Sequence, residues 1–292
     1  MKLFITGSSG YVGNKVMESV LEHGHEVVAL VRSAEGKLIN DLRITYVYGD
    51  ITDPLSLSGI MNGCEVVIHL VGIIREVPRK GITMNRIHVE GTRNIVTETK
   101  KTGINRFLHM SALGVKENSR VAYHQSKWEA EQIVRESGLS YTIFRPSVIF
   151  GEGGPGPNFV DQLRDLVKNA PIVPVIGDGS SLLQPVSVKN VADGFAKGLE
   201  LKQTIGKTYE LGGPEQISYL KILSLIADSL DKRLKKIHVP ITLMKYIVPI
   251  MGKIPQFPIT NDQLTMLLEG NITSKAETYY NDFGLQPIPF EI

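Results

Sequence analysis

Three glycines near the N-terminus constrain the fold of this chain more than any other feature. Gly7, Gly10 and Gly13 follow one another at three-residue spacing, directly after a short apolar run at residues 3–5. The apolar residues that come next recur at helical spacing, and a second apolar run covers residues 26–31. This pattern predicts a buried strand, a tight turn, the start of a helix and a second strand. Glycine permits the sharp turn, and the free N–H groups of a helix N-terminus attract anions, so the turn predicts a pyrophosphate site.

The alternation of strands and helices continues through the first half of the chain. Further strands are predicted at residues 44–47, 65–70, 106–110 and 141–144, and helices at residues 56–61, 85–101 and 123–136. Strands separated by helices of this length favour a parallel sheet covered on both faces. The predicted fold class is therefore α/β, with a Rossmann-type doubly wound parallel sheet.

The regularity ends after Phe150, where a glycine- and proline-rich segment covers residues 151–157. Helices are predicted beyond it at residues 159–168, 188–201 and 219–230, and short strands at residues 172–175 and 208–211. We therefore divide the chain into a dinucleotide-binding domain at 1–150 and a smaller α/β substrate lobe at 151–292, with some later segments returning to the first domain. Ligands of such sheets bind outside the carboxyl ends of the strands, where the lobe would cover them.

Composition excludes several classes of function. Among the 292 residues there is one cysteine, so neither an internal disulfide nor a cysteine metal cluster is expected, and no metal site is predicted. A formal net charge of +2 gives no field that would favour nucleic acid. No apolar run approaches the roughly 18 to 20 residues of a membrane span. The first strand begins too early to leave room for a signal peptide, and we expect a cytoplasmic protein.

A second constellation carries the chemistry. Tyr123 and Lys127 are four residues apart on a predicted helix and therefore share one face. The ammonium group of a desolvated Lys127, together with a bound nicotinamide cation, is expected to lower the pKa of the Tyr123 phenol, which would then act as a general acid or base on a carbonyl or hydroxyl group. Ser111 follows a predicted strand and is expected to hydrogen-bond the same oxygen of a small-molecule substrate. Ser111, Tyr123 and Lys127 are thus the predicted catalytic residues.

Several motifs together resemble the extended and atypical short-chain dehydrogenase/reductases, which include proteins akin to epimerases and dehydratases. They lie at residues 6–13, 49–50, 111, 123–127, 145–151, 184–192 and 209–214. The last two resemble the branch that contains the nucleotide-binding accessory subunit of respiratory complex I. The resemblance covers nearly the whole chain and implies a Rossmann-type domain, a bound NAD(P) and a C-terminal substrate lobe.

The predicted cofactor site combines the glycine turn with residues at the ends of later strands. Its members are Gly7, Ser8, Ser9, Gly10, Tyr11, Val12, Gly13, Arg32, Ser33, Asp50, Ile51, Leu70, Val71, Gly72, Tyr123, Lys127 and Pro146. Folds that select NAD usually place a carboxylate at the end of the second strand. This chain has Arg32 and Ser33 there, and both can bind a 2′-phosphate. NADP is therefore the predicted cofactor, with NAD as the alternative.

Three functions agree with these residues. The first is an NADP-dependent oxidoreductase of the short-chain type. The second is a non-catalytic NAD(P)H-binding module that serves assembly or redox sensing in a larger complex. The third is a sugar-nucleotide epimerase or dehydratase, although such enzymes commonly carry an arginine where this chain has Gln184.

The segment 237–259 is rich in Pro, Met and Ile, and its apolar residues include Leu243, Met244, Ile247 and Val248. Three interpretations stay open: core of the small lobe, a wall for an apolar substrate, or a contact with a membrane surface or a protein complex. The sequence leaves the oligomeric state open as well.

Overall fold

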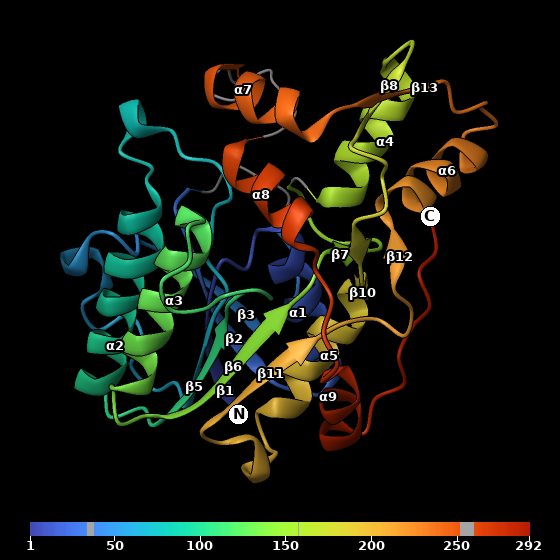
Figure 1. Ribbon diagram of the computed structural model, residues 1–292. Coiled ribbons are helices and arrows are strands. Elements are labelled where there is room, and N and C mark those ends of the chain that lie inside the picture. Colours follow the sequence, from blue (N-terminus) through green and yellow to red (C-terminus); the bar gives the residue numbers. More distant parts are fainter. Residues whose placement is uncertain (34–37, 157, 252–259) are drawn as a thin grey trace.

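A parallel sheet forms the centre of the protein, in a computed structural model that describes residues 1–33, 38–156, 158–251 and 260–292 (Figure 1). Over these residues it has seven strands in the order β11-β6-β5-β4-β1-β2-β3, with parallel neighbours throughout. The strands are β1 (Lys2–Thr6), β2 (Glu26–Val31), β3 (Ile44–Tyr48), β4 (Val66–His69), β5 (Arg106–Met110), β6 (Ser140–Pro146) and β11 (Lys207–Leu211). The strand order reverses between β1 and β4, which is where open α/β sheets bind ligands. The predicted Rossmann-type sheet is confirmed.

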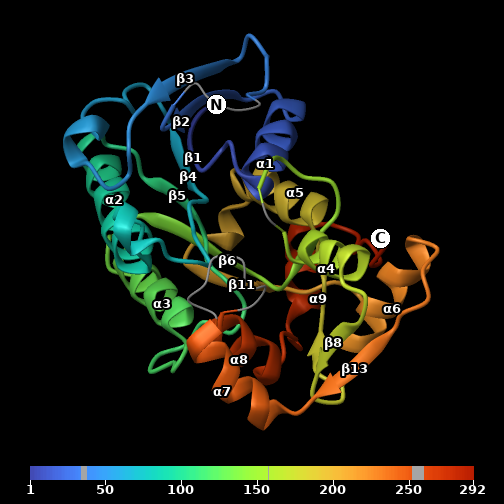
Figure 2. The same cartoon turned by 90° about the horizontal axis from the view of Figure 1, so that it is seen from above.

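Helices cover both faces of this sheet (Figure 2). One face carries α1 (Tyr11–Glu22), α5 (Val188–Gly198) and α9 (Ala276–Phe283), and the other carries α2 (Gly91–Lys101) and α3 (Ala122–Arg135). Within the described ranges, no helix is long and apolar enough to cross a membrane.

Two predicted helices differ from the structure. Instead of a helix at 56–61, the chain forms a short 3₁₀ turn, η1 (Pro54–Leu57), which begins at a proline and is capped by the carboxylate of Asp53. The helix predicted at 85–101 starts as a π-helical turn, η3 (Asn85–Glu90), and becomes α-helical only at Gly91. Two further 3₁₀ turns, η2 (Pro78–Lys80) and η4 (Lys202–Thr204), lie in connections.

The later part of the chain supplies both lobes. Strand β11 pairs with β6, with Tyr209 beside Phe144, and so belongs to the central sheet although its residues were predicted beyond the boundary at 150. The smaller lobe contains β7 (Ile149–Phe150), β8 (Val173–Ile176), β9 (Leu182–Leu183), β10 (Val186–Ser187), β12 (Ile217–Ser218), β13 (Lys236–Val239), α4 (Phe159–Asn169), α6 (Tyr219–Ser229), α7 (Ile241–Met251) and α8 (Asn261–Glu269). Most of its short strands and two of its helices were not predicted, namely β7, β9, β10, β12, β13, α7 and α8, and neither was α9.

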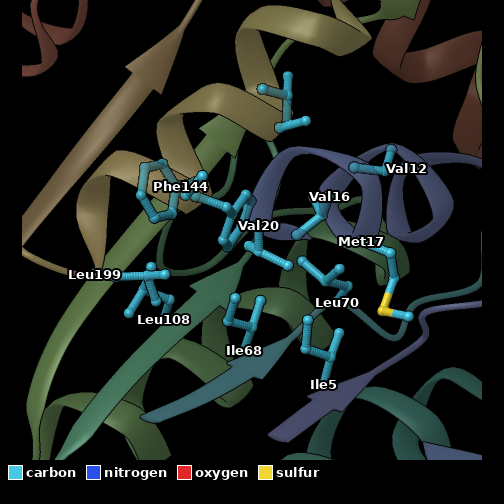
Figure 3. Close-up of a cluster of buried hydrophobic side chains, with 14 of the residues drawn as sticks. Ile5, Val12, Val16, Met17, Val20, Ile68, Leu70, Leu108, Phe144 and Leu199 are labelled. Atoms are coloured by element: carbon cyan, nitrogen blue, oxygen red, sulfur yellow. The ribbon is translucent and has the colours of Figure 1, made fainter. Parts of the chain in front are cut away.

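The main core lies between the sheet and the helix pair α1 and α5 (Figure 3). Ile5, Ile68 and Phe144 extend from three different strands toward Val16 and Val20 of α1. Phe144 is completely buried, and its ring centroid lies 4.3 Å from that of Phe195 on α5. Close aromatic packing of this kind fixes α5 on the sheet, although α5 follows β6 by more than forty residues.

Replacing Phe144 by alanine should therefore destabilise the whole protein. Removing a fully buried phenylalanine side chain costs about 3–5 kcal/mol, because apolar burial is lost and a cavity remains. Leu42→Ala is a suitable control, since Leu42 is fully exposed and its loss should change stability by less than about 0.5 kcal/mol. Chemical denaturation measures both values. Equal effects of the two substitutions would contradict this description of the core.

Candidate functional site

The glycine turn after β1 leaves the start of α1 open to an anion. Gly7 has a φ of +77°, and a side chain at Gly13 would overlap the carbonyl oxygen of Gly7, so the helix packs against the turn only because Gly13 lacks one. Helix α1 begins at Tyr11, and no side chain caps its N-terminus at Gly10. The first N–H groups of the helix therefore have no side-chain acceptor and can receive a phosphate group.

The other predicted residues of the turn have different surroundings. The hydroxyl oxygen of Ser8 is buried without a hydrogen-bond partner, as expected where a ligand completes the site, whereas Ser9 is exposed. The side chain of Val12 lies in the core, so only its backbone can face a ligand. The hydroxyl group of Tyr11 donates to the carbonyl oxygen of Gly151 at 2.8 Å. The glycine-rich segment after β7 therefore lies over the turn.

The residues predicted at other strand ends meet along the same edge of the sheet. Arg32 and Ser33 are exposed immediately after β2. Asp50 follows β3, and its carboxylate accepts from both the backbone N–H and the hydroxyl group of Thr52. Ile51 is buried beside it.

Strands β4 and β6 contribute the inner part of the edge. Leu70 is buried in the core and Val71 is half-buried, while Gly72 is exposed. A Cβ atom at Gly72 would lie 3.0 Å from Nζ of Lys127, so a glycine lets the lysine approach this backbone. Pro146 ends β6, and its carbonyl oxygen accepts from the N–H group of Leu113.

Lys127 extends from α3 into the buried space between two strand ends. Its Nζ donates to the carbonyl oxygens of Met110 at 3.1 Å and Val71 at 3.5 Å, and only 2% of the residue is exposed. Burial lowers the pKa of Lys127 to about 8, although the carboxylate of Glu131 acts in the opposite direction. The amine can therefore gain or lose a proton near neutral pH.

Tyr123 lies one turn before Lys127 and is 9% exposed. Burial raises the pKa of Tyr123 to about 12, so the protein alone does not produce the lowering that was expected from Lys127 together with a nicotinamide cation. The reason is the apolar environment, which penalises a phenolate. The ring packs in a cluster with Met84, Ala112, Val115 and Val121, with Met266 at its border. Tyr123 is thus a neutral phenol that is suited to donate a proton.

Ser111 directly follows β5 and comes close to both groups along the chain. Its neighbour Met110 binds Lys127, and its other neighbour, Ala112, packs in the cluster of Tyr123. The hydroxyl oxygen of Ser111 is buried and has no hydrogen-bond partner. A buried hydroxyl group without a partner is costly unless a ligand or water binds it, so Ser111 is well placed for a substrate oxygen.

His88 was not among the predicted residues. It connects the edge of the sheet that carries the predicted cofactor residues with α3, the helix of Tyr123 and Lys127. The π-helical turn η3 places its ring edge-on to Tyr123, with centroids 5.6 Å apart. Its Nε2 accepts from the N–H group of Ile73 at 2.9 Å, so Nδ1 carries the proton and donates to Ser126 at 2.8 Å. Burial and the nearby Lys127 lower the pKa of His88 to about 2, which keeps the ring neutral. Nothing in the sequence spacing distinguishes this histidine.

Helix α8 of the smaller lobe packs over Tyr123. One carboxylate oxygen of Asp262 accepts from the backbone N–H of Tyr123 at 3.0 Å and thereby caps the N-terminus of α3. Glu269 lies 3.9 Å from Lys116, in the loop after Ser111. Asp262, Met266 and Glu269 share one face of α8 because they are four and three residues apart. This face of α8 packs the smaller lobe against Tyr123 and the loop after Ser111.

Burial of Lys127 predicts a pH dependence of stability. Its pKa of about 8 in the folded protein lies below the ordinary 10.5, so between these values the unfolded chain binds more protons than the folded one. The free energy of unfolding should then rise with pH, by about 1 kcal/mol per pH unit, and Lys127→Met should remove that rise. Urea unfolding between about pH 7.5 and 10 measures it, with Lys202→Met at an exposed position as the control. Equal slopes in the two variants would contradict the prediction.

Comparison with known proteins agrees with this geometry. A family model described as NAD(P)H-binding matches residues 7–172. The 40 kDa subunit of NADH-ubiquinone oxidoreductase from Neurospora crassa is 24% identical over 97% of this chain and 75% of its own length. Ceramide reductase from Caulobacter vibrioides is 31% identical over 66% of this chain and 58% of its own length. UDP-glucose 4-epimerase from Thermotoga maritima has the same fold, with a TM-score of 0.73, 18% identity and coverage of 98% of this chain and 94% of its own.

These matches confirm the resemblance that the motifs indicated, both to the extended short-chain dehydrogenase/reductases and to the accessory subunit of complex I. The matched region, residues 7–172, contains both the glycine turn and the strand ends that form the candidate site. The chain belongs to the NAD(P)H-binding family, with the oxidoreductase-type Rossmann fold of that group.

Proposed function

We propose that this protein is an NADP-dependent oxidoreductase that interconverts a carbonyl and a hydroxyl group on a small apolar molecule. The observation that carries the proposal is the unpaired, buried hydroxyl group of Ser111, which follows β5 between the backbone that binds Lys127 and the cluster around Tyr123. Membership of the NAD(P)H-binding family indicates that the chain binds a dinucleotide. Ser111, Tyr123 and Lys127 provide the groups that would act on a substrate oxygen.

Each residue has one role in this reaction. The hydroxyl groups of Ser111 and Tyr123 hydrogen-bond the substrate oxygen, and Tyr123 donates its proton to that oxygen during reduction. The bound dinucleotide supplies the hydride. Lys127 binds the ribose next to the nicotinamide and, with a pKa of about 8, exchanges protons with the hydroxyl groups around it. Ser8 and the first N–H groups of α1 hold the phosphates.

The surroundings of Tyr123 favour an apolar substrate. The cluster that contains the ring consists of Met84, Ala112, Val115 and Val121, and methionine adapts readily to irregular apolar ligands. One relative of this chain is named a ceramide reductase, which supports reduction of a lipid-like molecule.

Gln184 argues against a sugar nucleotide. Its side-chain nitrogen donates to the carbonyl oxygen of Gly213 at 2.8 Å, and its side-chain oxygen accepts from the N–H group of Thr273 at 2.9 Å. The amide therefore joins three segments of the chain. The Gln184 side chain is uncharged and both ends of its amide bind other parts of the protein, so it offers no positive charge for a diphosphate. The epimerase alternative therefore loses support.

A non-catalytic role is the second candidate. Several relatives are named as subunits of mitochondrial complex I, which favours a nucleotide-binding module within a larger assembly. The two candidates differ in one measurable property, because only the oxidoreductase changes the redox state of bound NADP when a suitable carbonyl compound is added.

Replacing Tyr123 by phenylalanine should separate turnover from binding. Loss of the proton donor should reduce kcat by about 10²-fold or more, while the dissociation constant for NADPH stays unchanged. Oxidation of NADPH is followed by absorbance across a panel of apolar aldehydes and ketones, with binding measured by calorimetry. Tyr141→Phe is the matched control, since Tyr141 lies near the start of β6, whereas the candidate site lies at the carboxyl end of that strand. Equal kcat for Y123F and the wild type would disprove the assigned role. Tight binding without turnover in the wild type would favour the second candidate.

Replacing Arg32 by alanine tests the choice of cofactor. The exposed guanidinium group follows β2, where it can pair with a 2′-phosphate, so R32A should bind NADP about tenfold more weakly and leave NAD binding unchanged. Calorimetric titration with both dinucleotides measures this. Arg93→Ala, on the exposed face of α2, is the control. An equal loss for NAD and NADP would contradict a contact with the 2′-phosphate.

A further inference from the structure

One segment of the smaller lobe is strongly basic. Between Asp231 and Asp262 the sequence contains no aspartate or glutamate, although the whole chain is nearly neutral with a net charge of +2. The described part of this segment carries Lys232, Arg233, Lys235, Lys236 and Lys245. The remainder of the protein is therefore net acidic, and positive charge is concentrated in this segment.

Large apolar side chains are exposed among these cations. Tyr246 is 78% exposed, and Ile172, Ile237, Ile241 and Leu243 are also exposed. Strand β13 pairs with β8, so Lys236 lies beside Val173, the residue that follows Ile172. We call this surface the basic-apolar rim. It consists of residues 172, 232, 233, 235–237, 241, 243, 245 and 246.

Helix α7 is attached to the lobe by its other face. Met244 and Val248 are four residues apart and are buried in the lobe core, while Leu243, Lys245 and Tyr246 are exposed. The exposed apolar residues therefore do not contribute to that core. An exposed set of this size requires a partner or a function.

The rim lies at the same end of the molecule as the candidate site. Figure 1 shows α7 and β13 at the end toward which β6 and β11 point, and Figure 2 shows α7 beside α8, with β13 farther along the same side of the molecule. Helix α8 in turn caps the helix of Tyr123 through Asp262. Whatever binds the rim therefore lies near the substrate end of the site.

We propose that the basic-apolar rim docks on an anionic lipid surface. Lysine is depleted in the cores of protein–protein interfaces, whereas segments that lie in a membrane interface combine lysine and arginine with leucine, isoleucine and aromatic residues. Tyrosine is enriched at the level of the lipid headgroups. The sequence between Asp231 and Asp262 adds no carboxylate that anionic headgroups would repel, and each basic residue near such a surface adds to the attraction.

Docking of this kind gives the lobe a direct route to an apolar substrate. The route from lipid to Tyr123 rests on the proposed function, but the docking itself does not, because no residue of the rim belongs to the candidate site. A failure of one proposal is thus distinguishable from a failure of the other.

Vesicle flotation with the full chain tests the docking. The wild type should float with vesicles that contain about one third phosphatidylglycerol, remain in solution with pure phosphatidylcholine, and be released by salt at about 0.5 M. Lys235→Glu combined with Lys236→Glu should weaken binding at least about tenfold. Lys100→Glu combined with Lys202→Glu should bind like the wild type, since these exposed lysines precede β5 and β11 at the opposite edge of the sheet.

The apolar part of the rim is tested separately with Tyr246→Trp. The fluorescence of this residue should shift to shorter wavelength on anionic vesicles, and brominated lipids should quench it, in contrast to Trp128, the one tryptophan of the wild type. Circular dichroism confirms that each variant is folded. A folded wild type that stays in solution with anionic vesicles at low salt would overturn the proposal, and so would equal flotation of both lysine double variants. Salt-resistant binding to an acidic protein, without flotation, would likewise overturn it.

Discussion

The buried amine of Lys127 is the interaction on which the arrangement of the site depends. It binds the carbonyl oxygen of Val71, after β4, and that of Met110, the last residue of the neighbouring strand β5, and so links the backbone at these two strand ends. Removing an ammonium group from water is costly, and the hydrogen bonds to Met110 and Val71 offset part of that cost. The helix that carries Lys127 therefore has one favourable position on the sheet, and Tyr123 takes its place from that helix.

Two further side chains connect α3 to other parts of the protein. His88 joins the backbone at Ile73 to Ser126 of the same helix, so it links α3 directly to the edge where a dinucleotide would cross. Asp262 joins the start of that helix to the smaller lobe. Because its carboxylate caps the N–H group of Tyr123 itself, the smaller lobe contacts the helix at the residue that carries the phenol. Neither residue touches a reacting atom, and both act by position.

The sequence allowed much of this architecture to be predicted, for physical reasons that differ among its parts. Glycine spacing and continuous apolar runs are local signals, so β1, β2 and β5 and the start of α1 were predictable. The connection between β6 and β11 spans about sixty residues, and only packing of Phe144, Phe195 and Tyr209 decides it. Strand β13 has a single neighbour, β8, and mostly exposed side chains, so no alternation identifies it. The capping box of Thr260 and Gln263 was a usable signal for α8 that the prediction missed.

The pKa of Tyr123 shows why a charged neighbour in the sequence was insufficient to predict the properties of the site. A lysine four residues away suggested a lowered pKa for Tyr123, but the ring is also enclosed by residues that are distant in sequence, Met84 just before η3 and Met266 of α8, in addition to the loop after β5. Their combined effect outweighs the single charge, because Lys127 is itself poorly solvated and directed toward carbonyl oxygens. The folded chain thus keeps the phenol neutral and the amine ready to exchange a proton. That combination suits the proposed reduction, in which the substrate oxygen must receive a proton.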